Sequence, residues 1–175
     1  MAKKVRIIIP CRIVYVNCWR PVSQYGGEEK YSLTAVIPKD DEATVQIIND
    51  AIEQTRNASL DKWGGRVPGG LRYPLHDGDE AGNAIYKNAW YVNMKSRDKP
   101  QIVDRNVQTI TDQTEVYSGC YARVSCTVYA YSFGPAKGIG LWLGNIQKIS
   151  DGPAVGGRVA AADEFTPIPA DDFLQ

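Results

Sequence analysis

The fold of this chain is decided by the stretch CYARVSCTVYAYSF, which spans residues 120–133. Alternate residues of this stretch, from Cys120 to Ala130, are small and apolar. The residues between them are polar or aromatic: Tyr121, Arg123, Ser125, Thr127, Tyr129 and Tyr131. Successive side chains of a β-strand point to opposite faces, so this pattern predicts a strand with one face in a core and the other face outside.

The outer face of this predicted strand combines tyrosine rings with a cationic side chain. Such a face suits unpaired bases, because every base has a π-face to stack and the cations can contact phosphates. The same tyrosines could equally cover a second layer of core. The strand by itself leaves both interpretations open.

Four further strands and one helix are predicted around this strand. The N-terminal strand, residues 4–16, is rich in β-branched side chains, and we expect it to be broken or bulged at Pro10. A helix is predicted over residues 42–56, because Asp40 and Asp41 offer an N-cap ahead of apolar residues at helical spacing. Alternation and turn signals predict the remaining strands over residues 31–37, 89–97 and 139–149.

Five strands with turn signals between them and one helix favour a mainly β fold, a five-stranded OB-fold-like barrel. The helix follows the second strand instead of the third, and a β-sandwich stays open as an alternative. Residues 57–88, rich in glycine, proline and charge, are expected to form a long ordered excursion. We expect one domain over residues 1–150 and a flexible acidic C-terminal tail over residues 151–175.

The formal net charge is zero, but the charges are unevenly placed. Four of the 20 acidic residues lie beyond the last basic residue, Arg158, so residues 1–158 carry a formal charge of about +4. A basic body with an acidic end can attract a polyanion while its own tail competes for the same surface. The sequence also lacks a bilayer-spanning apolar stretch and a signal peptide, which predicts a cytoplasmic protein without a membrane partner.

Catalytic and metal-binding patterns are weak. His76 is the single histidine, and no Walker loop or dinucleotide-binding glycine motif is present. Asp77, Asp79 and Glu80 lie beside His76 and could hold a hard cation, although their spacing is not that of an EF-hand. The four cysteines form no CxxC pair, which argues against zinc. We therefore expect no enzyme activity, no cofactor and no metal.

Basic and aromatic residues instead recur together along the chain. Lys62, Trp63 and Arg66 form one group, and Arg72 with Tyr73 follows closely. The pattern matches a groove in which cations follow phosphates while rings stack bases. The alternative is that lysines protect strand edges and that Trp63 and Tyr73 anchor a loop. The candidate DNA-binding residues are Lys62, Trp63, Arg66, Arg72, Tyr73, Tyr91, Lys95, Arg97, Tyr121, Arg123, Tyr129 and Tyr131.

Short motifs in a fixed order also resemble a known family, from about Lys30 to the C-terminus. The family is that of bacteriophage single-stranded DNA-binding proteins of the OB-fold type, formerly a domain of unknown function. The N-terminal strand, with its cysteines and Trp19, is much less diagnostic. The motifs are Tyr31-Ser32-Leu33, Ile37-Pro38-Lys39, Lys62-Trp63-Gly64-Gly65, Pro74-Leu75, Asp77-Gly78-Asp79-Glu80, Asn93-Met94-Lys95-Ser96, Pro100, Val103-Asp104, Tyr117-Ser118-Gly119-Cys120-Tyr121, Gly138-Ile139, Leu143-Gly144-Asn145-Ile146-Gln147-Lys148 and Asp151-Gly152.

The resemblance implies non-catalytic binding of single-stranded DNA with little base preference, in phage DNA replication, recombination and repair. It places the protein in the cytoplasm of the infected host cell. It also implies that the tail, with Asp171, Asp172 and Phe173, contacts phage or host replication and recombination proteins and tempers DNA binding. Four acids are few for such a tail.

Three other functions stay open on the sequence alone. A virion structural or assembly protein would form particles or stable oligomers and would not bind nucleic acid. A carbohydrate-binding barrel would also use aromatic platforms, but sugar sites need fewer cations. A metal-dependent nuclease would have to be built on Asp77, Asp79 and Glu80. The oligomeric state, including a homo-oligomer, leaves no trace in the sequence.

Overall fold

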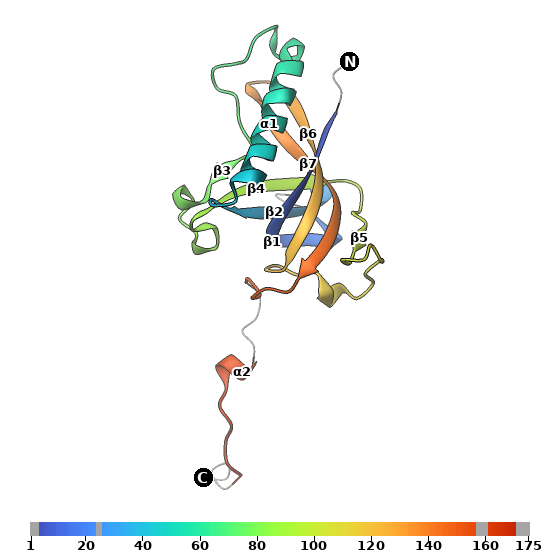
Figure 1. Ribbon diagram of the computed structural model, residues 1–175, viewed down its shortest axis with the longest axis vertical. Helices are drawn as coiled ribbons and strands as arrows, with labels where there is room; N and C mark the ends of the chain where they lie inside the picture. The colour runs from blue at the N-terminus through green and yellow to red at the C-terminus, as the bar shows by residue number, and fades with distance from the viewer. Residues whose placement is uncertain (1–3, 24–25, 157–160, 171–175) are drawn as a thin grey trace.

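The computed structural model describes residues 4–23, 26–156 and 161–170, and five long strands dominate it (Figure 1). These strands are β1 (Val5–Ser23), β2 (Glu29–Pro38), β4 (Ala89–Ser96), β6 (Tyr121–Phe133) and β7 (Ala136–Ser150). Two short strands are β3 (His76–Asp77) and β5 (Ile102–Val103). The helices are α1 (Glu42–Ala58), α2 (Ala161–Glu164) and the 3₁₀ turns η1 (Leu60–Trp63), η2 (Gly78–Glu80), η3 (Ala84–Tyr86) and η4 (Gln113–Glu115).

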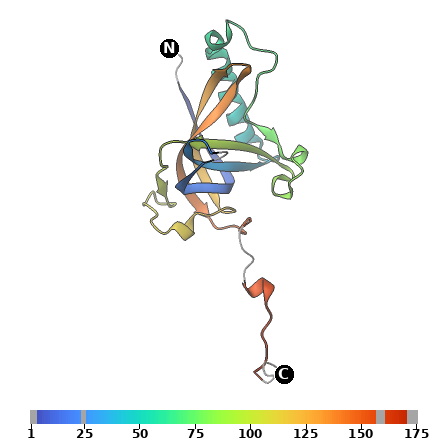
Figure 2. The ribbon, with the colours of Figure 1, turned by 180° about the vertical axis from the view of Figure 1, so that it is seen from behind.

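The five long strands close into a barrel. Antiparallel ladders join β4 to β2, β2 to β1, β1 to β6 and β6 to β7. A parallel contact between Lys95 of β4 and Trp142 of β7 completes the circle. Figure 2 shows β2 and β4 running across the direction of the long β6–β7 hairpin. The predicted five-stranded OB-fold-like barrel is confirmed, with α1 between the second and third barrel strands.

The two faces of β6 differ as the alternation predicts. Its apolar set, from Cys120 to Ala130, is buried in the barrel core, and Val124 is 0 % exposed. The intervening residues, from Tyr121 to Tyr131, are half-buried or exposed. One face of this strand therefore contributes to the barrel core, and the aromatic face lies outside the core.

The irregular point of β1 is not at Pro10, where it was predicted. Pro10 pairs in register with Arg123 of β6, in the part of β1 that does not pair with β2. A proline lacks the N–H that a second neighbour would need, so this one-sided position tolerates it. The register shift comes later, between Val14 and Asn17, where Tyr15 adopts a φ of 49°.

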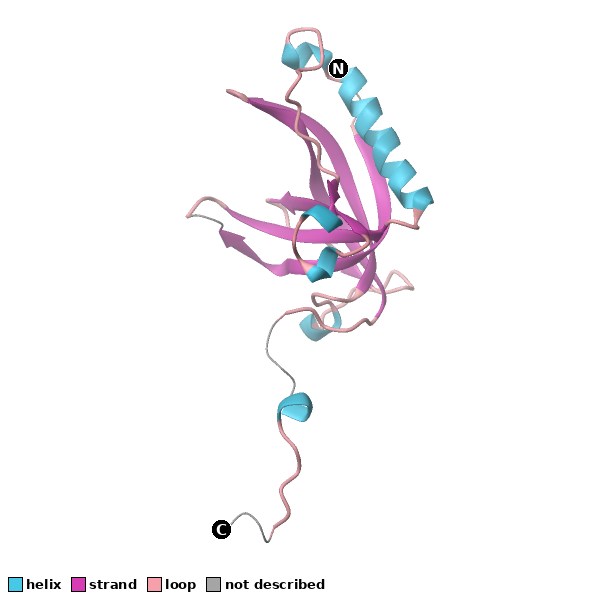
Figure 3. Ribbon diagram, turned by 90° about the vertical axis from the view of Figure 1, so that its left-hand side faces the viewer, coloured by secondary structure: helices cyan, strands magenta, loops and turns pink. Residues whose placement is uncertain are grey.

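The predicted helix is confirmed and runs to Ala58. Asp41 caps it by accepting hydrogen bonds from the backbone N–H and the hydroxyl of Thr44. The buried side chains, including Ile48 and Ile52, repeat at helical spacing and pack on the core. Seen from the side, α1 stands at the same end of the barrel as the β6–β7 hairpin (Figure 3).

The segment after β7 begins as part of the barrel and not as a free tail. Val155 N–H donates to the Ser118 carbonyl at 2.8 Å, and Arg12 donates to the carbonyls of Gly119 and Pro153. The flexible tail was predicted from residue 151, but residues 153 and 155 are hydrogen-bonded to the barrel. Within the described segments, no helix combines the length and apolarity that a membrane crossing requires.

Candidate nucleic-acid interface

A row of glycines on β7 shapes the aromatic face of β6. Tyr129 pairs with Gly140, and Tyr131 pairs with Gly138. A Cβ on Gly140 would lie 2.7 Å from the Tyr129 ring, and one on Gly138 would lie 2.6 Å from the Tyr131 hydroxyl. Because these glycines have no side chain, both tyrosine rings can lie across the neighbouring strand and present a flat surface.

Other rings extend this surface on both sides. Tyr129 stacks on Trp142 with ring centroids 4.4 Å apart, and Tyr131 stacks on Phe133 at 6.0 Å. Lys30 Nζ lies 5.8 Å from the centre of the Trp142 ring. Burial raises the pKa of the Tyr129 hydroxyl, and Tyr131 acts in the same direction. The result is a continuous aromatic platform, formed by Tyr129, Tyr131, Phe133 and Trp142.

A hollow of about 990 Å³ opens on one side of this platform, and we call it the cationic hollow. Asp98 is the one acid among its lining residues. Arg97 forms an ion pair with Glu28 at 3.1 Å. Among the described residues, Lys30 and Lys95 form no ion pair. The basic residues that line it are Lys4, Arg6, Lys30, Lys62, Lys95 and Arg97. This concentration of positive charge suits a phosphate backbone.

A second hollow of about 660 Å³ lies on the other side of Tyr129 and Tyr131, and we call it the tyrosine pocket. Lys95 lines both hollows, so they are neighbours. None of the residues that line the tyrosine pocket is acidic, and Arg72 and Lys95 are its two Lys or Arg side chains. Its lining includes Tyr15, Asn17, Ser32, Thr34, Arg72, Tyr73, His76, Tyr86, Asn93, Lys95, Tyr129 and Tyr131.

Seven of the twelve predicted DNA-binding residues line these two hollows. Arg72 reaches the tyrosine pocket because its backbone pairs with β7, with its N–H 2.9 Å from the Lys137 carbonyl. Tyr73 lines the same pocket and its hydroxyl accepts a hydrogen bond from Arg56 at 3.2 Å. The seven are Lys62, Arg72, Tyr73, Lys95, Arg97, Tyr129 and Tyr131.

The stacking role expected of Trp63 is not compatible with its position. Its side chain is 6 % exposed and belongs to the core, and its indole N–H donates to the Tyr131 carbonyl at 3.1 Å. Lys62 donates from Nζ to the Ala130 carbonyl at 3.0 Å. Both residues therefore hold η1 against the part of β6 that follows Val128. Val128 is the last residue of β6 that pairs with β1. Trp63 supports the platform from behind and cannot stack a base.

Two other predicted residues also lie outside the hollows. Tyr91 is stacked on Tyr86 at 4.1 Å and tilted against His76 at 5.1 Å, and these two residues line the tyrosine pocket whereas Tyr91 does not. Arg66 is exposed on the loop after η1 and lines neither hollow.

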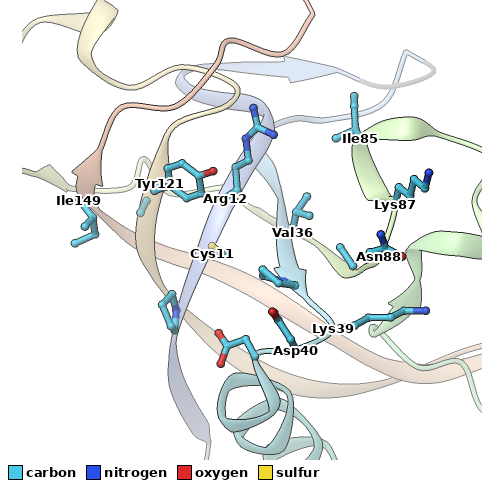
Figure 4. A pocket seen from close by; sticks show the side chains of 15 residues that line it. Cys11, Arg12, Val36, Lys39, Asp40, Ile85, Lys87, Asn88, Tyr121 and Ile149 are labelled. Carbon is cyan, nitrogen blue, oxygen red and sulfur yellow. The ribbon is translucent and has the colours of Figure 1, made fainter.

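Tyr121 and Arg123 lie at the opposite end of β6. Tyr121 lies eight residues before Tyr129, which is about 26 Å of extended strand. It borders a separate hollow of about 740 Å³ with Arg12, Lys39 and Asp40 (Figure 4). Arg123 donates to the Gln147 side chain at 3.2 Å. The structure does not bring these two residues to the platform.

Several residues of the two hollows escaped the sequence interpretation. The sequence around Trp142 did carry a signal, because Gly138 and Gly140 share its face of β7 and leave room for rings from β6. Tyr15, Lys30 and Asn93 gave no comparable signal. They come to the site through the barrel closure and the irregular part of β1.

The acidic loop that suggested a cation site already holds an ammonium group. Lys39 Nζ lies 2.7 Å from an oxygen of Asp77 and 2.7 Å from an oxygen of Asp79. Hydrogen bonds from Lys39 lower the pKa of both carboxyl groups. No group of three or more metal-ligating side chains is found within the described parts of the chain.

The four cysteines are structural. All four are buried and unpaired by disulfides, and burial raises the pKa of each thiol. A thiol with a raised pKa stays protonated and behaves as a small apolar group. The predicted tail residues Asp171, Asp172 and Phe173 lie outside the described residues.

Comparison with known proteins agrees with this geometry. The family described as "Enterobacter phage Enc34, ssDNA-binding protein" matches residues 3–174. A protein designated p50, of Acyrthosiphon pisum secondary endosymbiont phage 1, is 28 % identical over 166 residues, which cover 88 % of each chain.

Two solved structures share the fold. The single-stranded DNA-binding protein of bacteriophage Enc34, in complex with single-stranded DNA, superposes with a TM-score of 0.76 at 22 % identity and covers 89 % of this chain and 95 % of that one. The single-stranded DNA-binding protein gp2.5 of bacteriophage T7 gives a TM-score of 0.65 at 15 % identity, covering 94 % and 96 %. With the match over residues 3–174, the chain belongs to the Enc34 single-stranded DNA-binding protein family.

Proposed function

We propose that this protein binds single-stranded DNA across the aromatic platform and serves phage DNA replication and recombination in the infected host cell. The observation that carries the proposal is the platform between two hollows, one of which collects six basic residues. Rings at this place can stack unpaired bases while the cations contact the phosphates. Family membership and the DNA-bound Enc34 structure support the same function.

Stacking and phosphate contacts do not depend on the identity of the base, so we expect binding to show little sequence preference. Binding of this kind requires no catalytic step, no cofactor and no metal ion. Duplex DNA hides the faces of its bases in the helical stack, so the platform favours the single strand over the duplex.

A fluorescence-anisotropy titration with an unstructured oligonucleotide of mixed sequence tests this function. We expect tight binding that weakens with salt, and poor competition by duplex of equal length. If neither the full-length protein nor a tail-less variant binds at low salt, the proposal is wrong. An assembly role should then be tested by particle formation.

We also propose that the acidic end of the chain competes with DNA for the basic side chains of the cationic hollow. The same end would contact replication and recombination proteins. Exposed Phe165 and Ile168 follow Glu164 in the described part of this segment, and such side chains can dock on a partner. Deletion of residues 161–175 should tighten DNA binding, because it removes an internal polyanion. Equal or weaker affinity after the deletion, measured in the same titration, would contradict this mechanism.

A further inference from the structure

The tyrosine pocket differs in chemistry from the cationic hollow beside it. Its lining includes four uncharged polar side chains from β1, β2 and β4, which are Asn17, Ser32, Thr34 and Asn93. Its volume of about 660 Å³ falls in the range of small-molecule sites, about 300 to 1,000 Å³. A phosphate would find few cations here, whereas an uncharged, flat ligand would find rings and hydrogen-bonding groups.

Five tyrosines line this pocket, and four of them come in two pairs beside Tyr73. Tyr129 and Tyr131 come from β6, while Tyr15 and Tyr86 come from β1 and η3. Aromatic rings from separate elements thus surround one hollow, as a site for a flat ring requires.

Tyr15 reaches this position through an unusual backbone. Its φ of 49° is uncommon for a residue with a side chain, and it occurs where the register of β1 shifts. Asn83 fixes the ring by donating to the Tyr15 hydroxyl at 3.0 Å, and the ring lies 6.4 Å from that of Tyr86. Bulges and strained residues of this kind often re-aim a side chain at a binding site.

The lining of the pocket offers a hydrogen-bond donor without a partner among the described residues. The Thr34 hydroxyl donates to Asn93 Oδ1 at 2.6 Å, which leaves the two N–H groups of the Asn93 amide directed elsewhere. Asn93 Nδ2 has no protein acceptor among the described residues, and Asn93 is exposed in the pocket. The amide can therefore donate to a carbonyl oxygen of a ligand.

We propose that the tyrosine pocket accepts one base of the bound single strand, turned out of its stack, and that Asn93 Nδ2 donates a hydrogen bond to a carbonyl oxygen of that base. This inference rests on the proposed function and names the subsite and the ligand class. Thymine, cytosine and guanine carry such a carbonyl, whereas adenine does not. Three of the four bases fit, so the preference is modest and compatible with general binding.

The test compares oligothymidylate with an oligomer of equal length that carries difluorotoluene in place of thymine. The analogue keeps the shape and stacking face of thymine but accepts hydrogen bonds very poorly. We expect Asn93→Ala to weaken binding of oligothymidylate about fivefold, the effect of one hydrogen bond, and to leave binding of the analogue unchanged.

Tyr129→Ala is the matched control, because loss of a stacking ring should weaken both oligomers alike. Thermal unfolding of Asn93→Ala verifies its fold. Equal losses for both oligomers, or no loss for either, would overturn the base pocket while leaving single-strand binding intact. If wild-type protein binds neither oligomer, the proposed function itself fails.

Discussion

The two ends of β6 carry similar sequences but have different surroundings. At the hairpin end, Tyr129 lies over Gly140 and stacks on Trp142 beside a concentration of basic residues. At the other end, Tyr121 pairs with Ser150 and lies against Gly152, where the chain leaves the barrel. The difference shows that the neighbouring strand, and not the tyrosine itself, decides whether a ring forms part of the aromatic platform.

The largest contrast is expected from removing one ring at each end. Tyr129→Ala should weaken binding of single-stranded DNA by about 1 to 3 kcal/mol, the contribution of one stacked base. Tyr121→Ala, the matched change at the far end, should leave the affinity nearly unchanged. Anisotropy titrations of both variants measure the difference, and a comparable loss for Tyr121→Ala would place DNA along the whole strand.

A smaller effect is expected from the strand beneath the ring. Gly140→Ala would place a Cβ 2.7 Å from the Tyr129 ring and should push it out of the platform. Overpacking of this kind costs about 1 to 3 kcal/mol of folding stability, and we expect DNA affinity to fall with it. Gly70→Ala is the control, because nothing lies within 4 Å of its added Cβ. Tight DNA binding by a folded Gly140→Ala variant would mean that the flat position of the ring is unimportant.

The charges at the two ends should differ in their response to salt. Lys95→Ala should reduce the slope of log K against log salt concentration by about 0.7, the value for one phosphate contact on a single strand. Arg123→Ala should leave the slope unchanged, because Arg123 lies away from both hollows and is hydrogen-bonded to Gln147. A reversed result would move the phosphate path to the far end of β6.

The smallest effect concerns the hollow at the far end, where Lys39 contacts Asp77 and Asp79. The pKa of both carboxyl groups is lowered in the folded protein, so their contribution to stability is present above about pH 4 and is lost as the pH falls through the lowered pKa values. Lys39→Met should therefore lower the melting temperature slightly at pH 7 and less at acidic pH. A loss of DNA affinity in this variant, at pH 7, would show that the far hollow belongs to the binding surface.

Much of the fold could be predicted from the sequence because its signals are local. The alternation of β6 identifies its buried face, and Asp41 with the apolar spacing that follows identifies α1. The irregularity of β1 could not be placed, because proline marks a position without an N–H and not the point where pairing shifts. Tyr15, which lies at the register shift, cannot be told from an ordinary strand residue in the sequence.

The site was harder to predict because it depends on contacts between distant segments. Trp63 and Lys62 look like an exposed aromatic–cation pair, but their hydrogen bonds to Tyr131 and Ala130 hold η1 against β6. Likewise, Asp77 and Asp79 suggest a metal site until Lys39, 38 residues before Asp77, is brought between them. Neither outcome follows from residue type or local spacing.

Crosslinking tests the central claim most directly, because trypsin separates the two ends of β6 after Arg123. Single-stranded DNA that carries 5-iodouracil is bound, irradiated and digested with the protein, and the linked peptides are identified by mass spectrometry. We predict crosslinks in the peptide 124–137, which contains Tyr129 and Tyr131, and in the peptide 138–148, which contains Trp142. Crosslinks confined to the peptide 106–123, which contains Tyr121, would contradict the account.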